Sequence, residues 1–401
     1  MPGKIILPEN TMNPRSSALD AIKIKPLSEV RKNLRINWYR CPIERSRLIE
    51  LSQRSNLKGF FQAFGHIGLL IITGTISWYF FVQQQWLGFF PALFLHGTFA
   101  SFLTAPHHEL CHGSVFRTHW LNEAFLRVYS LLGWQNFPVY KFSHSYHHRF
   151  TLHPEGDREE VMPVTPSLRI LYLVQLFTFN IFGGYQSKGI IPAIKNSITL
   201  AMDKFDNPFN SWGSELYVDH KKERREARNW ARKLLLFHGL VVFGSIASGH
   251  WILAVLISGS VFIANWYRYF VGVPMHCGLR SNVPDFRKSV RTITLDPFTE
   301  FLYWHMNWHL EHHMYAAVPC YNLKSLYAEI ASDMPQPRTL VGAWKEMRET
   351  WKRQLNDPGY TFDTPIPSSS SGVEGDSNDL AVSMGTLAPE SIAEELSQKT
   401  K

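Results

Sequence analysis

Four apolar stretches that contain no Asp, Glu, Lys or Arg constrain the fold of this 401-residue chain. They are residues 59–82, 86–103, 234–249 and 251–267. A helix needs roughly 20 apolar residues to cross a bilayer, so these stretches can span a membrane, although the third is short. They form two pairs with short, uncharged connectors, which the alternative, buried helices of a soluble protein, rarely do. The sequence therefore predicts an all-α polytopic membrane protein with about four transmembrane helices in two hairpins.

Lysine and arginine gather outside the predicted hairpins, as in HKKERREARNWARK at residues 220–233. Because positive charge is retained on the cytosolic side, we expect both termini and the long middle segment in the cytosol. The chain end is rich in Ser, Gly, Pro and acidic residues, which predicts disorder. The predicted segments are a basic cytosolic N-terminal segment (1–58), a first transmembrane hairpin (59–104), a cytosolic segment (105–233), a second transmembrane hairpin (234–272), a second cytosolic segment (273–360) and a disordered tail (361–401).

Two further apolar stretches, residues 121–134 and 168–185, contain charged residues. We interpret them as helices that lie at the membrane interface or pack beneath the membrane. A fifth or sixth span at these positions is the alternative.

Half of the 18 histidines fall into three clusters. The first cluster is HHELCH at residues 107–112, and the pattern H-x-x-H-H then occurs twice, at 144–148 and 309–313. On a helix, positions i, i+3 and i+4 lie on one face, so each pattern points three imidazoles the same way. Imidazole is a common ligand of first-row transition metals. Isolated histidines inside the spans, such as His66, His96 and His238, are instead interpreted as hydrogen-bonded packing residues.

The number of clustered histidines indicates two metal ions rather than one. A tetrahedral zinc site takes four ligands and a catalytic zinc site fewer, whereas the clusters supply at least eight imidazoles. All three clusters lie on the predicted cytosolic side of the membrane. We therefore expect a cytosolic helical cap that holds a histidine-rich dimetal site. Spacing alone does not choose between iron, zinc and copper.

The motifs H-E-L-C-H at 108–112, H-S-Y-H-H at 144–148 and H-L-E-H-H at 309–313 resemble the three histidine boxes of integral-membrane fatty acid desaturases and related hydroxylases. The resemblance extends over residues 55–345 and includes HLEHHMYAAVPCYNLKSL after the third box. It implies a non-haem di-iron centre and an extra ligand before the third box, at His276 in GVPMHCG. His107 is the alternative to His108. The implied ligands are His108, His112, His144, His147, His148, His276, His309, His312 and His313.

Acidic residues in and near the boxes are candidates for orienting the imidazoles. Glu109 and Glu311 lie inside boxes, and Glu155 and Asp157 follow the second box. We expect them to accept imidazole N–H groups. Glu155 could equally be an ordinary surface residue, and His305 is a further candidate for the surroundings of the site.

The resemblance implies an O2-dependent desaturase that acts on an acyl chain of a fatty acid or lipid. The alternative within the same superfamily is a hydroxylase, epoxygenase or ketolase of a lipid or specialised metabolite. A zinc-dependent polytopic membrane hydrolase or a metal transporter is the alternative from a different class. Transporters place polar ligands within the spans, whereas these boxes lie outside the predicted spans.

Electrons for such a reaction must come from another protein. The sequence has no glycine-rich dinucleotide fingerprint and no cysteine run for an iron–sulfur cluster. An external donor is therefore implied, either cytochrome b5 with its reductase or a ferredoxin. The expected location is the endoplasmic reticulum membrane of a eukaryote, and no nucleic-acid partner is expected.

Overall fold

The computed structural model of the chain describes residues 26–157, 168–183, 189–205, 213–367 and 373–376. Most of the tail for which disorder is predicted lies outside the described residues, as do residues 1–25. The described part is mostly helical, and its strands are short.

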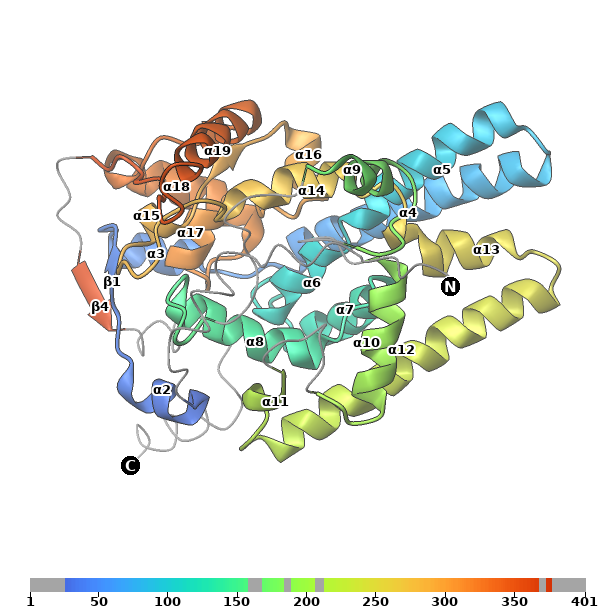
Figure 1. The fold of residues 1–401 in the computed structure, drawn as a ribbon, viewed down its shortest axis with the longest axis horizontal. Helices are drawn as coiled ribbons and strands as arrows, with labels where there is room; N and C mark the ends of the chain where they lie inside the picture. Colours follow the sequence, from blue (N-terminus) through green and yellow to red (C-terminus); the bar gives the residue numbers. More distant parts are fainter. Residues whose placement is uncertain (1–25, 158–167, 184–188, 206–212, 368–372, 377–401) are drawn as a thin grey trace, which may run out of the picture.

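Three helices in the described part are long and apolar enough to cross a membrane. The first is α4 (Asn56–Val82), and the third is α12 (Lys221–Ala247). The second consists of α5 (Trp86–Ser101) and α6 (Thr104–Cys111) taken together. A helix of 27 residues is about 40 Å long, more than the roughly 30 Å of a bilayer's hydrocarbon core. α4 and α5 form a hairpin with a tight connector at one end of the molecule (Figure 1).

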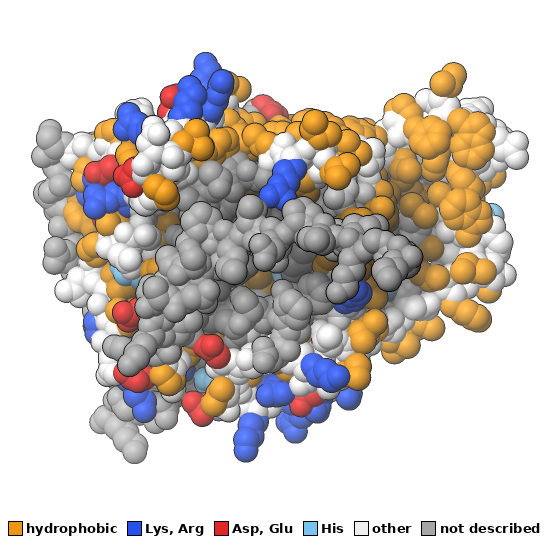
Figure 2. All heavy atoms as spheres, viewed as in Figure 1, with side chains coloured by type: hydrophobic (Ala, Val, Ile, Leu, Met, Phe, Trp, Pro, Cys, Tyr) orange, Lys and Arg blue, Asp and Glu red, His pale blue; other side chains and the backbone are white. Residues whose placement is uncertain are grey.

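The outer surfaces of these helices are hydrophobic. Figure 2 shows apolar side chains gathered over the end of the molecule formed by α4 and α5. Leu87 on α5 is 97% exposed and Phe243 on α12 is 71% exposed. Exposed apolar surface on this scale is unfavourable in water and favourable in lipid, so these helices are suited to a membrane.

The fourth predicted span differs from a continuous helix. Residues 251–267 form α13 (Ile252–Ala254), the π-helical turn η1 (Val255–Gly259) and the 3₁₀ turn η2 (Ser260–Phe262), before α14 (Trp266–Gly272) begins. The helix ends because the backbone pairs elsewhere: the Asn180 amide donates to the Phe262 carbonyl at 2.7 Å, and the Ala264 amide donates to the Thr178 carbonyl at 2.8 Å. A regular fourth transmembrane helix is therefore not seen at this stretch.

The described part of the segment between the hairpins is mostly helical. Of the two stretches predicted to lie at the interface, residues 121–134 fall largely in α7 (His119–Leu132), and residues 168–185, of which 184 and 185 lie outside the described residues, contain α9 (Ile170–Phe177). α8 (Phe137–Phe150) carries the second histidine box. Asn136 begins α8, because its side chain accepts the Val139 amide at 3.3 Å. The described residues of this segment also form α10 (Ile190–Ala201) and α11 (Gly213–Leu216) before α12 begins.

The C-terminal part surrounds a short helix that carries the third box, α17 (His309–Met314). Two two-residue strands, β2 (Ile293–Thr294) and β3 (Arg338–Thr339), pair in parallel beside it. The other elements are η3 (Val273–Met275), α15 (Phe286–Ser289), α16 (Pro297–Leu302), η4 (Cys320–Asn322), α18 (Leu323–Ile330), η5 (Ala331–Asp333) and α19 (Leu340–Gln354).

The described part of the N-terminal segment, residues 26–58, packs close to the end of the third box. It contains α2 (Leu27–Asn33), β1 (Asn37–Arg40) and α3 (Arg45–Leu51), and β1 pairs antiparallel with β4 (Val373–Asp376).

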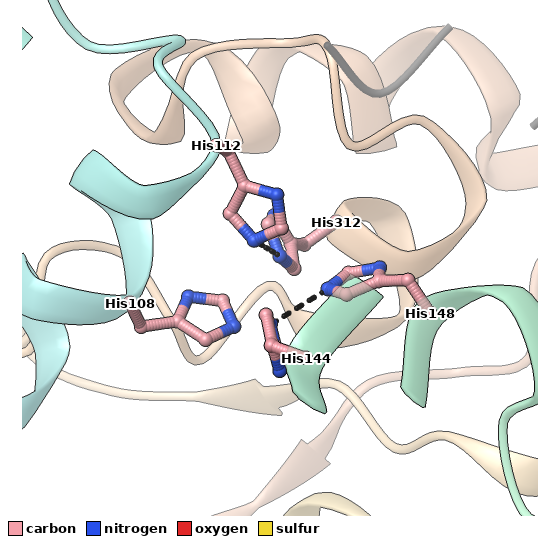
Figure 3. A group of neighbouring side chains, drawn as sticks. All are labelled: His108, His112, His144, His148 and His312. Atoms are coloured by element: carbon pink, nitrogen blue, oxygen red, sulfur yellow. Dashed lines mark hydrogen bonds between the residues drawn. The ribbon is translucent and has the colours of Figure 1, made fainter. Parts of the chain in front are cut away.

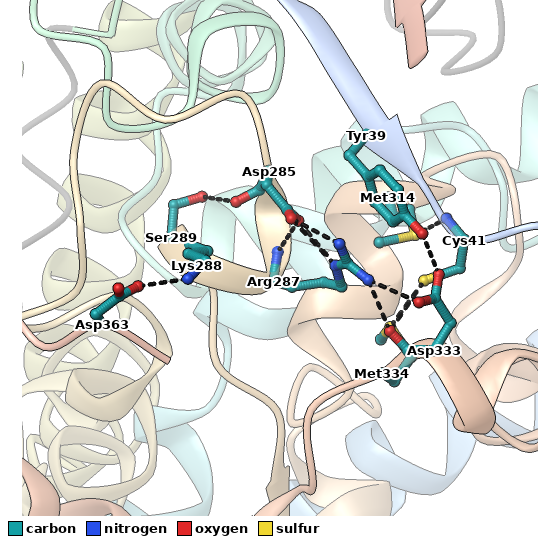
Figure 4. A network of polar contacts seen from close by, with 10 residues as sticks. All are labelled: Tyr39, Cys41, Asp285, Arg287, Lys288, Ser289, Met314, Asp333, Met334 and Asp363. Atoms are coloured by element: carbon teal, nitrogen blue, oxygen red, sulfur yellow. Dashed lines mark hydrogen bonds and ion pairs between the residues drawn. The ribbon is translucent and has the colours of Figure 1, made fainter. Parts of the chain in front are cut away.

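A polar network fixes this contact (Figure 4). The buried Arg287 guanidinium donates to Asp285 and to Asp333, and the Tyr39 hydroxyl donates to Asp333. The Cys41 amide meets the Met314 sulfur at 3.3 Å, one residue after the third box.

Candidate metal centre

Three helices and one loop bring the predicted ligands together. α6 carries His108 and ends at Cys111, and His112 is the first residue beyond it. α8 carries the second box, and α17 carries the third. His276 lies outside regular structure, directly after the 3₁₀ turn η3.

The nine histidines form two groups. Within each group one ring nitrogen of every residue lies within 4.8 Å of the others, and every member is buried. Figure 3 shows the first group, in which rings from α6, α8 and α17 face a common centre. The first group is His108, His112, His144, His148 and His312. The second group is His147, His276, His309 and His313.

The nitrogen separations match those of ligands that share an ion. In the first group, the Nε2 atoms of His144 and His148 are 2.9 Å apart, and those of His112 and His312 are 3.1 Å apart. In the second group, His309 Nε2 lies 2.9 Å from His276 Nε2 and 3.2 Å from that of His313. Two nitrogens about 2.1 Å from one ion and at right angles to each other would be about 3.0 Å apart. Five imidazoles also exceed the four ligands of a tetrahedral zinc site.

Several residues of the first group have a buried ring nitrogen without a hydrogen-bond partner among the residues that the structure describes, and His108 is one of them. His108 Nδ1 lies 3.0 Å from the Glu109 carboxylate. Its Nε2 is buried and makes no hydrogen bond to any residue that the structure describes. A buried polar atom without a partner is unfavourable, and a metal ion bound at this nitrogen would remove that penalty.

His108 belongs to the first group, whereas the adjacent His107 does not. His107 belongs to neither group, because its Nδ1 lies 2.9 Å from the Ser130 hydroxyl. The arrangement therefore favours His108 over His107 as the first residue of the site.

Three of the four residues in the second group have an oxygen partner at the ring nitrogen that faces away from the group, whereas His309 Nδ1 has no hydrogen-bond partner among the residues that the structure describes. His147 Nδ1 donates to Asp157 Oδ2 at 2.9 Å, and His276 Nδ1 donates to the Ser289 carbonyl at 2.9 Å. His313 Nδ1 lies 3.1 Å from Thr151 Oγ1. Such contacts fix the tautomer and the orientation of a metal-binding imidazole. The roles expected of Glu109 and Asp157 therefore have a geometric basis, whereas the Thr151 and Ser289 contacts were not predicted from the sequence.

Of the two other acidic candidates, Glu311 lies differently from the expectation, and Glu155 fits its alternative as a surface residue. Glu311 is buried, but its Oε2 accepts the Thr292 hydroxyl at 2.6 Å rather than an imidazole N–H. Burial raises the pKa of Glu311 to about 7, and the bond from Thr292 opposes this shift. Glu155 is exposed on the surface.

Burial also lowers the pKa of two box histidines that lie outside the spans and whose rings are close to each other, His148 and His313. The pKa of His148 falls well below its usual value because of burial and the nearby His313 and His144 rings. The pKa of His313 is lowered by burial and by His309 and His276. These imidazoles are therefore neutral at pH 7, which is the form that binds metals.

The isolated histidines inside the spans are hydrogen-bonded packing residues, as expected. His96 bridges Thr73 Oγ1 and the Leu256 carbonyl, each at 2.9 Å. His238 lies 2.9 Å from both Ser258 Oγ and the Leu131 carbonyl. His66 accepts the Trp304 indole N–H at 3.1 Å.

A mostly apolar cavity of about 340 Å³ lies between the spans. Its wall includes residues of α4, α5 and η1, and Leu103 and Leu132 also line it. Leu103 directly precedes α6, one helical turn before His107. None of the nine clustered histidines lines this cavity.

Comparison with known proteins agrees with these features. The model of the family described as "Fatty acid desaturase" matches residues 84–343, which include all nine clustered histidines. The chain belongs to the fatty acid desaturase family. Membership of this family implies that the protein is an oxidoreductase. A search of curated proteins gave no match.

Proposed function

We propose that this member of the fatty acid desaturase family is a membrane-bound, O2-dependent, non-haem di-iron enzyme that desaturates an acyl chain of a fatty acid or lipid. The observation that carries the proposal is the convergence of nine buried imidazoles, from segments as far apart in the chain as His108 and His312, into groups of five and four. Family membership supports the reaction class.

The first group would hold one iron ion and the second group the other. Iron bound there supplies the reduction of O2 and the removal of hydrogen from an unactivated C–H bond. The protein's own part is to hold the rings in place. Asp157 accepts the His147 N–H, and Glu109 accepts the His108 N–H, so each ring presents Nε2 to its group.

The surroundings suit reactive oxygen chemistry on a hydrocarbon. All nine histidines are buried, so bulk water has little access to the groups. The cavity between the spans is lined mainly by Ile and Leu side chains, which favours a saturated chain over a polar substrate.

The proposed setting is the endoplasmic reticulum membrane, with the histidine groups and both termini in the cytosol. Lys221, Lys222 and Arg225 at the start of α12 are exposed and positively charged. Such a surface suits docking of an acidic electron carrier such as cytochrome b5, reduced by its reductase, with a ferredoxin as the alternative donor.

Lipid analysis of an expressing host tests the proposal. We expect the wild type to produce an acyl chain with a new double bond, and His312→Ala to reduce that product by more than about 100-fold, because the variant removes a member of the first group. The matched control is His119→Ala, since His119 is exposed on α7 and lies outside both groups.

Three results would contradict the proposal. Undiminished product from His312→Ala would show that the first group is not the reacting centre. Zinc as the bound metal in purified protein would favour a hydrolase. A hydroxylated product in place of an unsaturated one would move the enzyme to the hydroxylase branch of the superfamily.

A further inference from the structure

One short segment connects His276 to the third box. Residues 289–293, here called the brace segment, run between the His276 loop and α17. At one end the Ser289 carbonyl accepts the His276 Nδ1–H at 2.9 Å. Further along, Thr292 Oγ1 donates to Glu311 and accepts the Leu310 amide at 3.4 Å. The brace segment therefore contacts His276 at one end and α17, the helix of the third box, at the other.

Arg291, in the middle of the brace segment, encloses the loop that carries His276. Its backbone amide donates to the Met275 carbonyl at 2.7 Å. Its guanidinium Nη1 donates to the Pro274 carbonyl and, at 3.1 Å, to the Cys277 carbonyl. Arg291 thus bonds the residues on both sides of His276.

The charge of Arg291 is balanced by a residue from a distant helix. Arg291 is 1% exposed, and its Nε donates to Glu346 Oε1 on α19 at 2.7 Å. Glu346 Oε2 also accepts Arg338 Nε at 3.0 Å. Removing one partner of a buried ion pair is costly, because it leaves the other charge uncompensated. Glu346 is therefore needed to keep the Arg291 guanidinium in place.

His276 depends on such support more than the other eight clustered histidines do. The box histidines lie on helices or at a helix end, where backbone hydrogen bonds fix their position. His276 follows a 3₁₀ turn and has φ −134° and ψ −9°, outside any helix. The contacts of the brace segment take the place of a helix at this residue.

We propose that Arg291 is a positioning residue for His276, and that the Arg291–Glu346 ion pair controls metal occupancy of the second group without controlling that of the first. This inference rests on the proposed function, because it requires that both groups bind metal.

Metal content of the purified full-length protein tests it. We expect the wild type to hold about two irons per chain. Glu346→Gln and Arg291→Lys should lower the affinity of the second group by about 10- to 100-fold, so that the content approaches about one iron per chain after dialysis against a mild chelator. Electron paramagnetic resonance should then show an uncoupled ferric ion in place of a coupled pair. A loss of general stability would not produce this signal.

The control variant is Arg338→Gln, which removes the other partner of Glu346 but leaves every contact of Arg291 with the His276 loop. It should keep the wild-type iron content. If Glu346→Gln and Arg291→Lys both retain two coupled irons, the inference is wrong and the proposed function stands. If the wild type binds no iron, the proposed function itself fails. Loss of both irons from the two variants would also overturn the inference, because it would show that the ion pair supports the whole centre.

Discussion

At the scale of single residues, the site depends on what holds the far side of each imidazole. Asp157, the Ser289 carbonyl and Thr151 each contact the Nδ1 atom of a different ring in the second group. The ring nitrogen that faces the group is then fixed as Nε2 in all three cases. Because these oxygens hold the three rings in place, the metal affinity expected of the second group depends on them as well as on the histidines.

Asp157→Ala should weaken metal binding at the second group by about 10- to 100-fold, because His147 loses the acceptor of its N–H. Titration of purified protein with a competing chelator measures the effect. Glu155→Ala is the matched control, since Glu155 is an exposed acid two residues away. Equal chelator resistance in the two variants would refute a role for Asp157 in holding the metal.

The sequence identifies the histidines but not all of their partners. H-x-x-H-H is rare enough to be informative, and Asp157 follows the second box closely enough to be suspected. Thr151 is a common residue type, and its contact with His313 joins positions 162 residues apart. The acceptor at Ser289 is a backbone carbonyl, which every residue possesses. Neither contact leaves a pattern in a single sequence.

At the scale of elements, hydropathy identifies apolar stretches but does not show where a helix ends. Three of the four predicted stretches lie in helices long enough to cross a membrane. The fourth is equally apolar, yet its end pairs with residues 178–180, so the helix stops at Phe262. Pairing with a distant segment is a tertiary effect that local composition does not encode.

The contact between α5 and the end of this broken helix is unusually close. A Cβ atom at Gly97 would lie 2.6 Å from the Ile263 Cβ and 2.7 Å from its carbonyl oxygen. We expect Gly97→Leu to destabilise the protein by about 1–3 kcal/mol through overpacking. Thermal unfolding in detergent measures the effect. Gly244→Leu on α12 is the control, because nothing lies within 4 Å of a Cβ there. Similar melting temperatures for both variants would contradict the expected close packing.

At the scale of the whole molecule, the proposed orientation places the α4–α5 connector on one side of the membrane and the start of α12 on the other. All four native cysteines are buried. An introduced surface cysteine should therefore react with a membrane-impermeant maleimide above a low background.

In sealed microsomes we expect Lys222→Cys to be labelled directly and Gln83→Cys only after the membrane is opened with detergent. Both positions are exposed, so accessibility depends on the side of the membrane rather than on burial. The reasoning is that basic segments stay on the cytosolic side. Labelling of both residues in intact vesicles would rule out the proposed two-sided arrangement.

The division of the two groups among distant parts of the chain also sets an order of assembly during synthesis. His312 belongs to the first group, and His309 and His313 belong to the second. Neither group is complete until the ribosome has passed the third box, and the support that Glu346 gives to Arg291 arrives later still. The first and second boxes must therefore wait with incomplete sets of ligands, so loading of the proposed metal ions would have to follow translation of the third box.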